Sequence, residues 1–174
     1  GYSRDDIIVL TPLNKSEMGR KKLNGLMQET YNPDGVQIPG SFFRVGDHVI
    51  QTKNNYKMGD EGIMNGQVGL IVSGGDSEET DAFADKEPPY MVVDFEDDIV
   101  DVTATQSATI DLAYALTIHK TQGSQFKVVV CAIPITRPDF MLRQLVYTAV
   151  TRASEHCMLL VQGSALESYV TNEM

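Results

Sequence analysis

The sequence has little cysteine and no long apolar run, and each shortage excludes a class of protein. Its 174 residues include two cysteines and three scattered histidines. Cys131 and Cys157 lie in apolar runs typical of strands, so we expect core residues rather than a disulfide or a metal pair. No run approaches the roughly 18 apolar residues of a membrane span, and the N-terminus lacks the layout of a signal peptide. We therefore expect a cytoplasmic protein without a metal site or membrane contact.

The sequence also lacks two patterns with which many enzymes hold nucleotide phosphates and magnesium. No Gly-x-x-x-x-Gly-Lys-Ser/Thr (Walker A) occurs, and no Asp-Glu pair follows an apolar strand in the manner of a Walker B motif. The phosphate cradle and the magnesium ligands are therefore missing from this chain, and we expect no ATP turnover from it alone.

The net charge of −10 argues against a phosphate-binding surface, but one segment carries the whole excess. Residues 76–101 contain 11 acids and one base, which leaves 24 − 11 = 13 acids against 14 − 1 = 13 bases elsewhere. We do not expect the acidic segment to face phosphates. The neutral remainder is compatible with a local basic groove.

Apolar patterning outside residues 41–105 predicts an α/β fold. The expected strands are 5–11, 127–133 and 156–162, with a further strand after residue 105, and the expected helices are 16–31, 139–154 and 165–171. Alternation of strands and helices implies a mainly parallel sheet. The first helix is expected to bury an apolar face made of Leu23, Leu26, Met27 and Tyr31.

Between residue 42 and about residue 105 the apolar period changes to two, which predicts a small β-barrel. Strand candidates are 47–52, 67–72, 90–95 and 99–103, with turns at Asn65-Gly66 and Asp97-Asp98 and a mobile loop over 73–89. We therefore assign residues 1–40 and 106–174 to the α/β domain and residues 41–105 to an inserted barrel.

The stretch from Leu112 to Phe126 is an apolar run that stops abruptly in small, polar and cationic groups. Apolar positions up to Ile118 anchor it in a core, and donors with a flexible glycine at Gly123 follow. A polar strip on a buried element suits ligand binding. A helix end, with Lys120 in the last turn and Gly123 as its stop, explains the same spacing equally well.

A second segment, Leu145–Ala153, favours the ligand-binding interpretation of the first. Thr-x-His-Lys-x-Gln-Gly-Ser at 117–124, followed by Val-Tyr-Thr-Ala-Val-Thr-Arg-Ala at 146–153, closely resembles motifs V and VI of superfamily 1 helicases, specifically the RecD-like (exodeoxyribonuclease V alpha type) branch. The resemblance implies a RecA-like parallel-sheet motor domain with an inserted Src-homology-3-like β-barrel.

The resemblance also implies a role for each motif residue. Arg152 would be the arginine finger that reaches ATP on the partner motor domain. The ordinary alternative is that Arg152 is a surface arginine on an amphipathic helix. Many relatives carry Glu at the position of Gln125, which can still bond a ribose hydroxyl but without charge. The implied nucleotide contacts here are Gly123, Ser124 and Gln125. The implied DNA contacts are Thr117, His119, Lys120 and Thr148.

Two further segments resemble the same family. Val-Leu-Thr-Pro at 9–12, a polar loop and Gly19, Leu23 and Asn24 are similar to motif IV, in which the nucleotide-facing cation is either Lys15 or Arg20. The run from Phe42 to Gly69 resembles the inserted barrel, which implies that Asn54, Asn55 and Tyr56 contact a single strand. A polar exit from a strand into a loop is the commoner explanation of those three residues.

The function implied is the C-terminal part of an ATP-dependent DNA helicase that moves 5′ to 3′ on single-stranded DNA in repair or recombination. ATP and Mg²⁺ would be bound mainly by the N-terminal motor domain of the same polypeptide, and none is expected in this chain. The expected partners are single-stranded DNA, that domain and, in some relatives, nuclease-complex subunits. The alternative is a non-catalytic module that binds single-stranded nucleic acid or protein.

Overall fold

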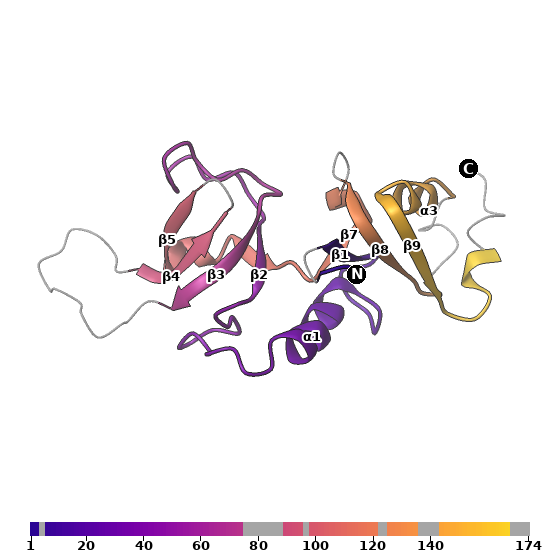
Figure 1. Cartoon of the computed structure of the whole chain (residues 1–174), viewed down its shortest axis with the longest axis horizontal. Helices are drawn as coiled ribbons and strands as arrows, with labels where there is room; N and C mark the ends of the chain where they lie inside the picture. The colour runs from indigo at the N-terminus through magenta and orange to yellow at the C-terminus, as the bar shows by residue number, and fades with distance from the viewer. Residues whose placement is uncertain (4–5, 75–88, 96–97, 122–124, 136–142, 168–174) are drawn as a thin grey trace, which may run out of the picture. The chain divides into compact units, whose positions relative to one another are not determined.

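The computed structural model describes residues 1–3, 6–74, 89–95, 98–121, 125–135 and 143–167. The chain divides into two compact units, residues 1–26 with 114–174 and residues 27–113. The first unit carries a parallel sheet and the second an antiparallel sheet (Figure 1). The domain ranges 1–40, 106–174 and 41–105 stay a prediction.

A four-stranded parallel sheet is the centre of the first unit. Its strands are β1 (Ile7–Thr11), β7 (Ala115–Thr117), β8 (Phe126–Ile133) and β9 (Ala153–Val161), in the order β7-β1-β8-β9. β1 pairs with β7 through Thr11↔Thr117 and with β8 through Ile7↔Val128. Continuous apolar runs suit strands flanked on both sides. The prediction of an α/β fold with a parallel sheet is confirmed.

Helix α1 (Arg20–Tyr31) starts four residues later than the predicted helix 16–31. The Arg20 and Lys21 amides donate to the carbonyl oxygens of Leu13 and Asn14, at 2.8 and 3.3 Å, so the chain folds back in a loop before the helix begins. A Cβ at Gly19 would lie 2.6 Å from the backbone nitrogen of Ser16. Only glycine fits this close approach without a backbone shift.

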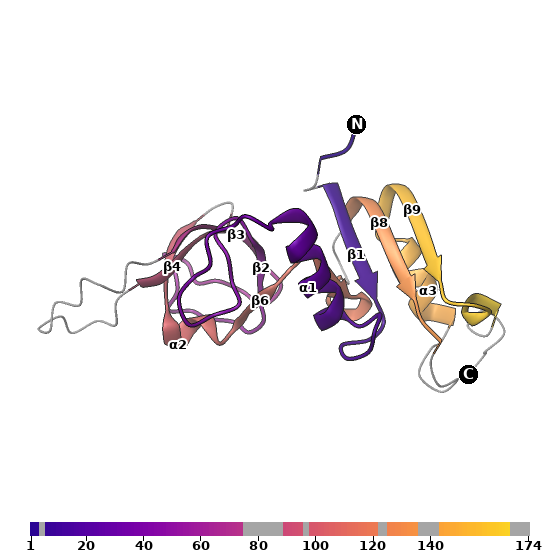
Figure 2. The ribbon, with the colours of Figure 1, turned by 90° about the horizontal axis from the view of Figure 1, so that it is seen from below.

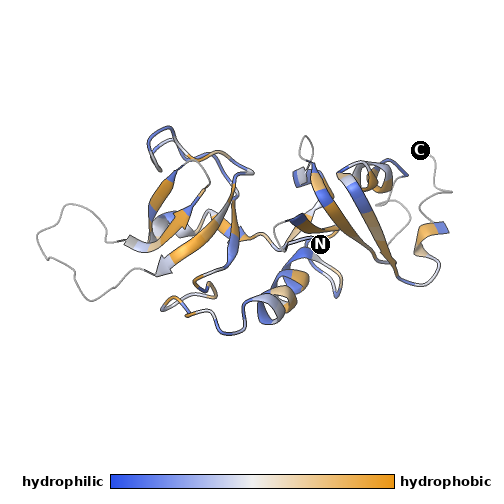
Figure 3. Cartoon of the chain, viewed as in Figure 1, coloured by the Kyte–Doolittle hydropathy of each residue, from blue (hydrophilic) through white to orange (hydrophobic). Residues whose placement is uncertain are grey.

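The buried face of α1 is polar, which corrects the predicted apolar face. Arg20, Asn24 and Gln28 are 6%, 2% and 6% exposed, whereas Leu26 and Tyr31 are 53% and 49% exposed. The three polar residues follow one another at intervals of four, so they lie on one side of the helix. Figure 3 shows α1 as largely hydrophilic, while β8 and β9 are hydrophobic along most of their length.

Helix α3 (Arg143–Val150) packs beside β8 and β9 (Figure 2) and ends earlier than the predicted residue 154. Thr151 and Arg152 form a turn, and β9 starts at Ala153, three residues before the predicted strand. Part of the predicted helix 139–154 lies outside the described residues. Residues 165–167 are helical, and the rest of the predicted helix 165–171 also lies outside them.

The two cysteines lie in neighbouring strands but differ in burial. Cys131 in β8 is buried and Cys157 in β9 is exposed, so the prediction of a core residue holds for Cys131 and is wrong for Cys157. The reason is the position of β9, which is the last strand of the sheet and, in the described part of the chain, pairs with β8 alone. An apolar run at an edge is not fully covered.

The second unit holds an antiparallel sheet with the order β5-β4-β3-β2-β6. Its elements are β2 (His48–Gln51), β3 (Val68–Gly74), β4 (Pro89–Asp94), β5 (Ile99–Thr103), the short helix α2 (Ala104–Ser107) and β6 (Ile110–Leu112). Alternate residues such as Met91, Val93, Val100 and Val102 face the core. The period-two prediction of four strands is confirmed. The strand expected between residue 105 and the segment 117–124 corresponds to two strands. β6 pairs with β2 in this antiparallel sheet, whereas β7 leads into residues 117–124 and joins the parallel sheet.

Turns of the second unit agree with the sequence where they are described. Gly66 has a φ of +99°, as a turn at Asn65-Gly66 requires. β4 and β5 form a hairpin in which the Phe95 amide donates to the Asp98 carbonyl oxygen at 3.0 Å. Asp97 and residues 75–88 of the predicted loop lie outside the described residues.

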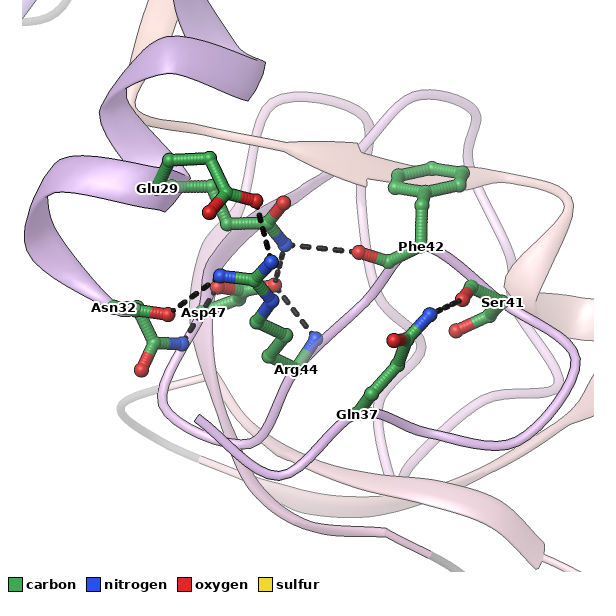
Figure 4. Close-up of polar contacts among 8 residues, drawn as sticks. Glu29, Asn32, Gln37, Ser41, Phe42, Arg44 and Asp47 are labelled. Atoms are coloured by element: carbon green, nitrogen blue, oxygen red, sulfur yellow. Dashed lines mark hydrogen bonds and ion pairs between the residues drawn. The ribbon is translucent and has the colours of Figure 1, made fainter. Parts of the chain in front are cut away.

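Within the second unit, a buried carboxylate joins the C-terminal end of α1 to the loop before β2 (Figure 4). Asp47 is fully buried, and its Oδ1 accepts from Asn32 Nδ2 at 2.7 Å. Its Oδ2 accepts from Gln28 Nε2 at 2.5 Å and from the Arg44 amide at 2.7 Å. The Arg44 guanidinium in turn bonds the Asn32 carbonyl oxygen at 2.9 Å and pairs with Glu29. Charge-assisted bonds of this kind are among the strong ones.

No helix of the described residues is long and apolar enough to cross a membrane.

Candidate functional site

The segment from Leu112 to Phe126 contains a short strand followed by one turn of 3-10 helix. β7 ends at Thr117, and η2 (Ile118–Thr121) follows directly. The helix alternative for this segment is therefore wrong over residues 115–117. Thr117 and Thr121 are 6% and 1% exposed, whereas His119 and Lys120 are exposed. Buried residues hold the turn in place and leave the two polar, basic side chains at the surface.

Arg152 brings the second segment into contact with the first. Its Nε donates to the Thr148 carbonyl oxygen at 3.2 Å, and its Nη2 donates to Thr151 Oγ1 at 3.4 Å. Its Nη1 lies 3.5 Å from the carbonyl oxygen of Thr121, the last residue of η2. The guanidinium is therefore oriented by groups from both segments, 31 positions apart in the sequence.

The residues around Arg152 lie at the amino-terminal ends of β8 and β9. The Phe126 amide donates to the Arg152 carbonyl oxygen at 2.9 Å, and Gln125, directly before β8, is exposed beside it. Thr148 Oγ1 donates to the Gln144 carbonyl oxygen at 2.7 Å, so this hydroxyl is engaged within α3. The predicted contacts Gly123 and Ser124 lie outside the described residues.

The other predicted nucleotide contacts, Lys15 and Arg20, follow the carboxyl end of β1. Lys15 is exposed in the loop after β1, and Arg20 is buried where α1 begins. Arg20 Nε donates to Asn14 Oδ1 at 3.2 Å, which holds the guanidinium against the loop. Because Thr11 and Thr117 are register partners, this loop and η2 leave the sheet at the same edge. η2 therefore begins at the same edge as this loop, and its last residue, Thr121, contacts Arg152.

Asn24, one helical turn after Arg20, contacts the strand that leads into η2. Asn24 Nδ2 donates to the Ala115 carbonyl oxygen at 3.0 Å, and the Ala115 amide donates to Asn24 Oδ1 at 2.8 Å. Both residues are buried. This pair was not predicted, although polar residues recur at intervals of four in the sequence (Arg20, Asn24, Gln28 and Asn32).

In the second unit, Asn54, Asn55 and Tyr56 form the start of a loop on the surface. Asn54 Nδ2 donates to the Tyr56 hydroxyl at 3.1 Å, and Asn54 Oδ1 accepts from the Asn65 amide at 2.9 Å. The Tyr56 side chain is 73% exposed. Asn55 pairs through its backbone with Ile63 at 2.8 and 3.0 Å, which closes the loop. An exposed ring held by its neighbour is suited to stacking on a base.

A pocket of about 390 Å³ lies nearby in the same unit, lined in part by Asp60, Glu61 and Asp98. Three carboxylates disfavour phosphate there. Among the residues that the structure describes, no group of three or more His, Cys, Asp or Glu is placed to hold a metal ion.

A charge interaction with shifted pKa values joins Asp6 to Lys127, the second residue of β8. Lys127 Nζ donates to Asp6 Oδ1 at 2.6 Å, and this bond, aided by Ser3, lowers the pKa of Asp6 to about 2. The same bond raises the pKa of Lys127. Burial raises the pKa of the Cys131 thiol to about 12, which keeps it protonated and unreactive.

Comparison with known proteins divides the chain in a similar way. Residues 112–160 match the UvrD-like helicase C-terminal domain, and residues 23–95 match the SH3 domain of ATP-dependent RecD-like DNA helicases. The ATP-dependent RecD2 DNA helicase of Deinococcus radiodurans is 35% identical over 159 residues, which are 90% of this chain and 20% of that protein. The chain thus spans about a fifth of the length of this curated relative.

Solved structures share the fold at lower identity. The Pif1 helicase of Candida albicans has a TM-score of 0.58 and 18% identity, covering 95% of this chain and 47% of that one. A Bacteroides Pif1 helicase, solved with ADP-AlF3 and single-stranded DNA, has a TM-score of 0.56 and 16% identity, covering 99% and 44%. The fold class is therefore a RecA-like parallel-sheet domain with an SH3-like insertion.

Proposed function

Because the chain is the C-terminal region of a RecD-like superfamily 1 helicase, we propose that it is the second motor domain of an ATP-dependent DNA helicase that moves 5′ to 3′ on single-stranded DNA. In this proposal it supplies motifs IV to VI, and the N-terminal part of the same polypeptide supplies the phosphate cradle. The isolated chain is then inactive.

The observation that carries the proposal is the contact between Arg152 and Thr121. An arginine finger must be held rigidly, because phosphoryl transfer relies on positioning and charge stabilisation more than on covalent chemistry. Two backbone carbonyls and a hydroxyl orient the guanidinium. One of those carbonyls belongs to the segment proposed to contact DNA, so the finger and the DNA contacts share a support.

The proposed DNA contacts are of two kinds. His119 and Lys120 are exposed on η2 and suit the sugar-phosphate backbone. Tyr56 offers an exposed ring to a base, with Asn54 and Asn55 beside it. Thr117 and Thr148 are less accessible, so in the proposal they orient neighbouring groups. The DNA seen with the Bacteroides Pif1 helicase supports single-stranded DNA as the ligand class.

ATP and Mg²⁺ are proposed as cofactors of the complete protein. The cations Arg152, Arg20 and Lys15 fit the charge of a triphosphate, which supplies the free energy for movement when it is hydrolysed. The described residues hold no acidic cluster of the kind that would retain Mg²⁺. In the proposal Arg152 stabilises charge, and the N-terminal motor domain holds the metal.

The test is a comparison of ATP hydrolysis by the complete protein and by this chain, each with and without oligothymidylate. The proposal expects hydrolysis that DNA stimulates in the complete protein and background hydrolysis in the chain. Turnover by purified chain, or none by the complete protein with DNA, contradicts it. The second result, together with DNA binding, favours a non-catalytic binding module.

A further inference from the structure

We infer that Asn24 is a positioning residue that holds β7 against α1. Because η2 follows β7 directly, Asn24 also fixes η2 relative to the loop after β1, which contains Lys15. The inference rests on the proposed function. It extends it by naming the residue through which the loop at Lys15 and Arg20 is joined to the DNA-facing turn at His119 and Lys120.

β7 is a buried strand with one edge to which no strand of the described residues is paired. This strand has three residues and pairs only with β1, at one end of the sheet. The Tyr114 carbonyl oxygen faces β1 and accepts from Val9, so the amide and carbonyl of Ala115 face the other way. Ala115 is fully buried, and a buried backbone group without a partner is costly. Asn24 supplies both missing partners at 2.8 and 3.0 Å.

The side chain of Asn24 is chemically suited to the backbone of Ala115. Pairing with one amide and one carbonyl of the same residue requires a donor and an acceptor on one planar group, as another strand would present. A carboxylate has no donor for the Ala115 carbonyl oxygen and repels it. A leucine of similar size has neither partner. Asparagine is therefore matched to this edge in both chemistry and length.

Asn24 lies between the loop after β1 and η2 in the chain of contacts. Four residues before it, Arg20 is fixed to Asn14 in the loop after β1. Two residues after its partner Ala115, β7 ends at Thr117 and η2 begins. A displacement of the loop on nucleotide binding therefore reaches η2 through one turn of helix and one pair of hydrogen bonds. Asn24 transmits nucleotide state to the DNA contacts without touching either ligand.

The test measures how far nucleotide changes the affinity of the complete protein for fluorescent oligothymidylate. The Kd is determined by anisotropy with ADP and with a non-hydrolysable ATP analogue, and the ratio of the two is the readout. Coupling of this kind is typically at least about fivefold. Asn24→Asp and Asn24→Leu should bring the ratio close to one. Ile8→Val, a conservative change in the core of the same unit, is the control and should keep the ratio.

Nucleotide affinity and melting temperature are measured on the same variants. A ratio close to one in a folded variant that still binds ADP supports the inference. A ratio like that of the wild type in either folded Asn24 variant overturns it, and so does an equal loss in Ile8→Val. If the wild type itself shows no DNA binding or no nucleotide effect, the proposed function fails, and the inference fails with it.

Discussion

Asp47→Ala should destabilise the chain strongly, because this carboxylate is fully buried and accepts three hydrogen bonds. Two of its donors retain another acceptor: Gln28 bonds the Phe42 carbonyl oxygen at 2.9 Å, and Asn32 bonds the Val45 carbonyl oxygen at 3.0 Å. All three donors lose Asp47, but Gln28 and Asn32 each keep one of two described bonds, whereas the Arg44 amide keeps none of those described. The loss is therefore smaller than the sum of three charge-assisted bonds at roughly 1.5–3 kcal/mol each, and we expect about 3 kcal/mol.

The assay is urea unfolding followed by circular dichroism, together with the melting temperature. About 3 kcal/mol corresponds to a decrease of about 6–12 °C for a chain of this size. Asp47→Asn should also destabilise, by more than about 1 kcal/mol, because its amide hydrogens must face at least one donor. Asp34→Ala removes the same charge from an exposed position and should change stability by less than about 0.5 kcal/mol. Equal stabilities of Asp47→Ala and Asp34→Ala would refute this account of the cluster.

Three further outcomes are expected. Lys127 lowers the pKa of Asp6 from 3.8 to about 2, so the ion pair contributes to folding stability above pH 4 and this contribution is lost as pH falls toward 2. Asp6→Asn should therefore lower the melting temperature at pH 5, and the difference in melting temperature from the wild type should become smaller below pH 4. A difference that does not change with pH contradicts the ion pair. A thiol reagent should label Cys157 in the folded chain and Cys131 only after unfolding, as mass spectrometry of the labelled peptides can show; labelling of Cys131 in the folded state contradicts its burial. The isolated chain should bind oligothymidylate weakly, with an affinity that falls between roughly 50 and 200 mM salt, and Tyr56→Ala should weaken it further; affinity that does not change with salt contradicts phosphate contacts.

The sequence predicted the features that depend on local patterns. Apolar runs predicted β1 and β8, period-two segments predicted β2 to β5, and the motifs at 117–124 and 146–153 carried the resemblance to the family. These patterns arise within a single strand or motif, so neighbouring residues are sufficient to reveal them.

Features that depend on distant partners were missed or wrong. The first helix was expected to bury Leu26 and Tyr31, because periodicity arguments assume an apolar buried face. Instead it buries Asn24 and Gln28, whose partners Ala115 and Asp47 are 91 and 19 positions away. Cys157 was expected to be buried because its run is apolar. The sequence of a single strand does not show whether that strand is central or at the edge of its sheet.

The most direct test of the central claim is the rate of DNA-stimulated ATP hydrolysis by the complete protein carrying Arg152→Ala. If Arg152 is the finger, kcat should fall by about 10³ or more while nucleotide affinity changes little, and Arg152→Lys should not restore it, because an ammonium lacks the planar fork. Arg143→Ala, which removes an exposed arginine from the start of α3, the helix before Arg152, should hydrolyse ATP like the wild type. Near-normal turnover by a normally folded Arg152→Ala protein would contradict the finger, and with it the nucleotide-facing role of this motif.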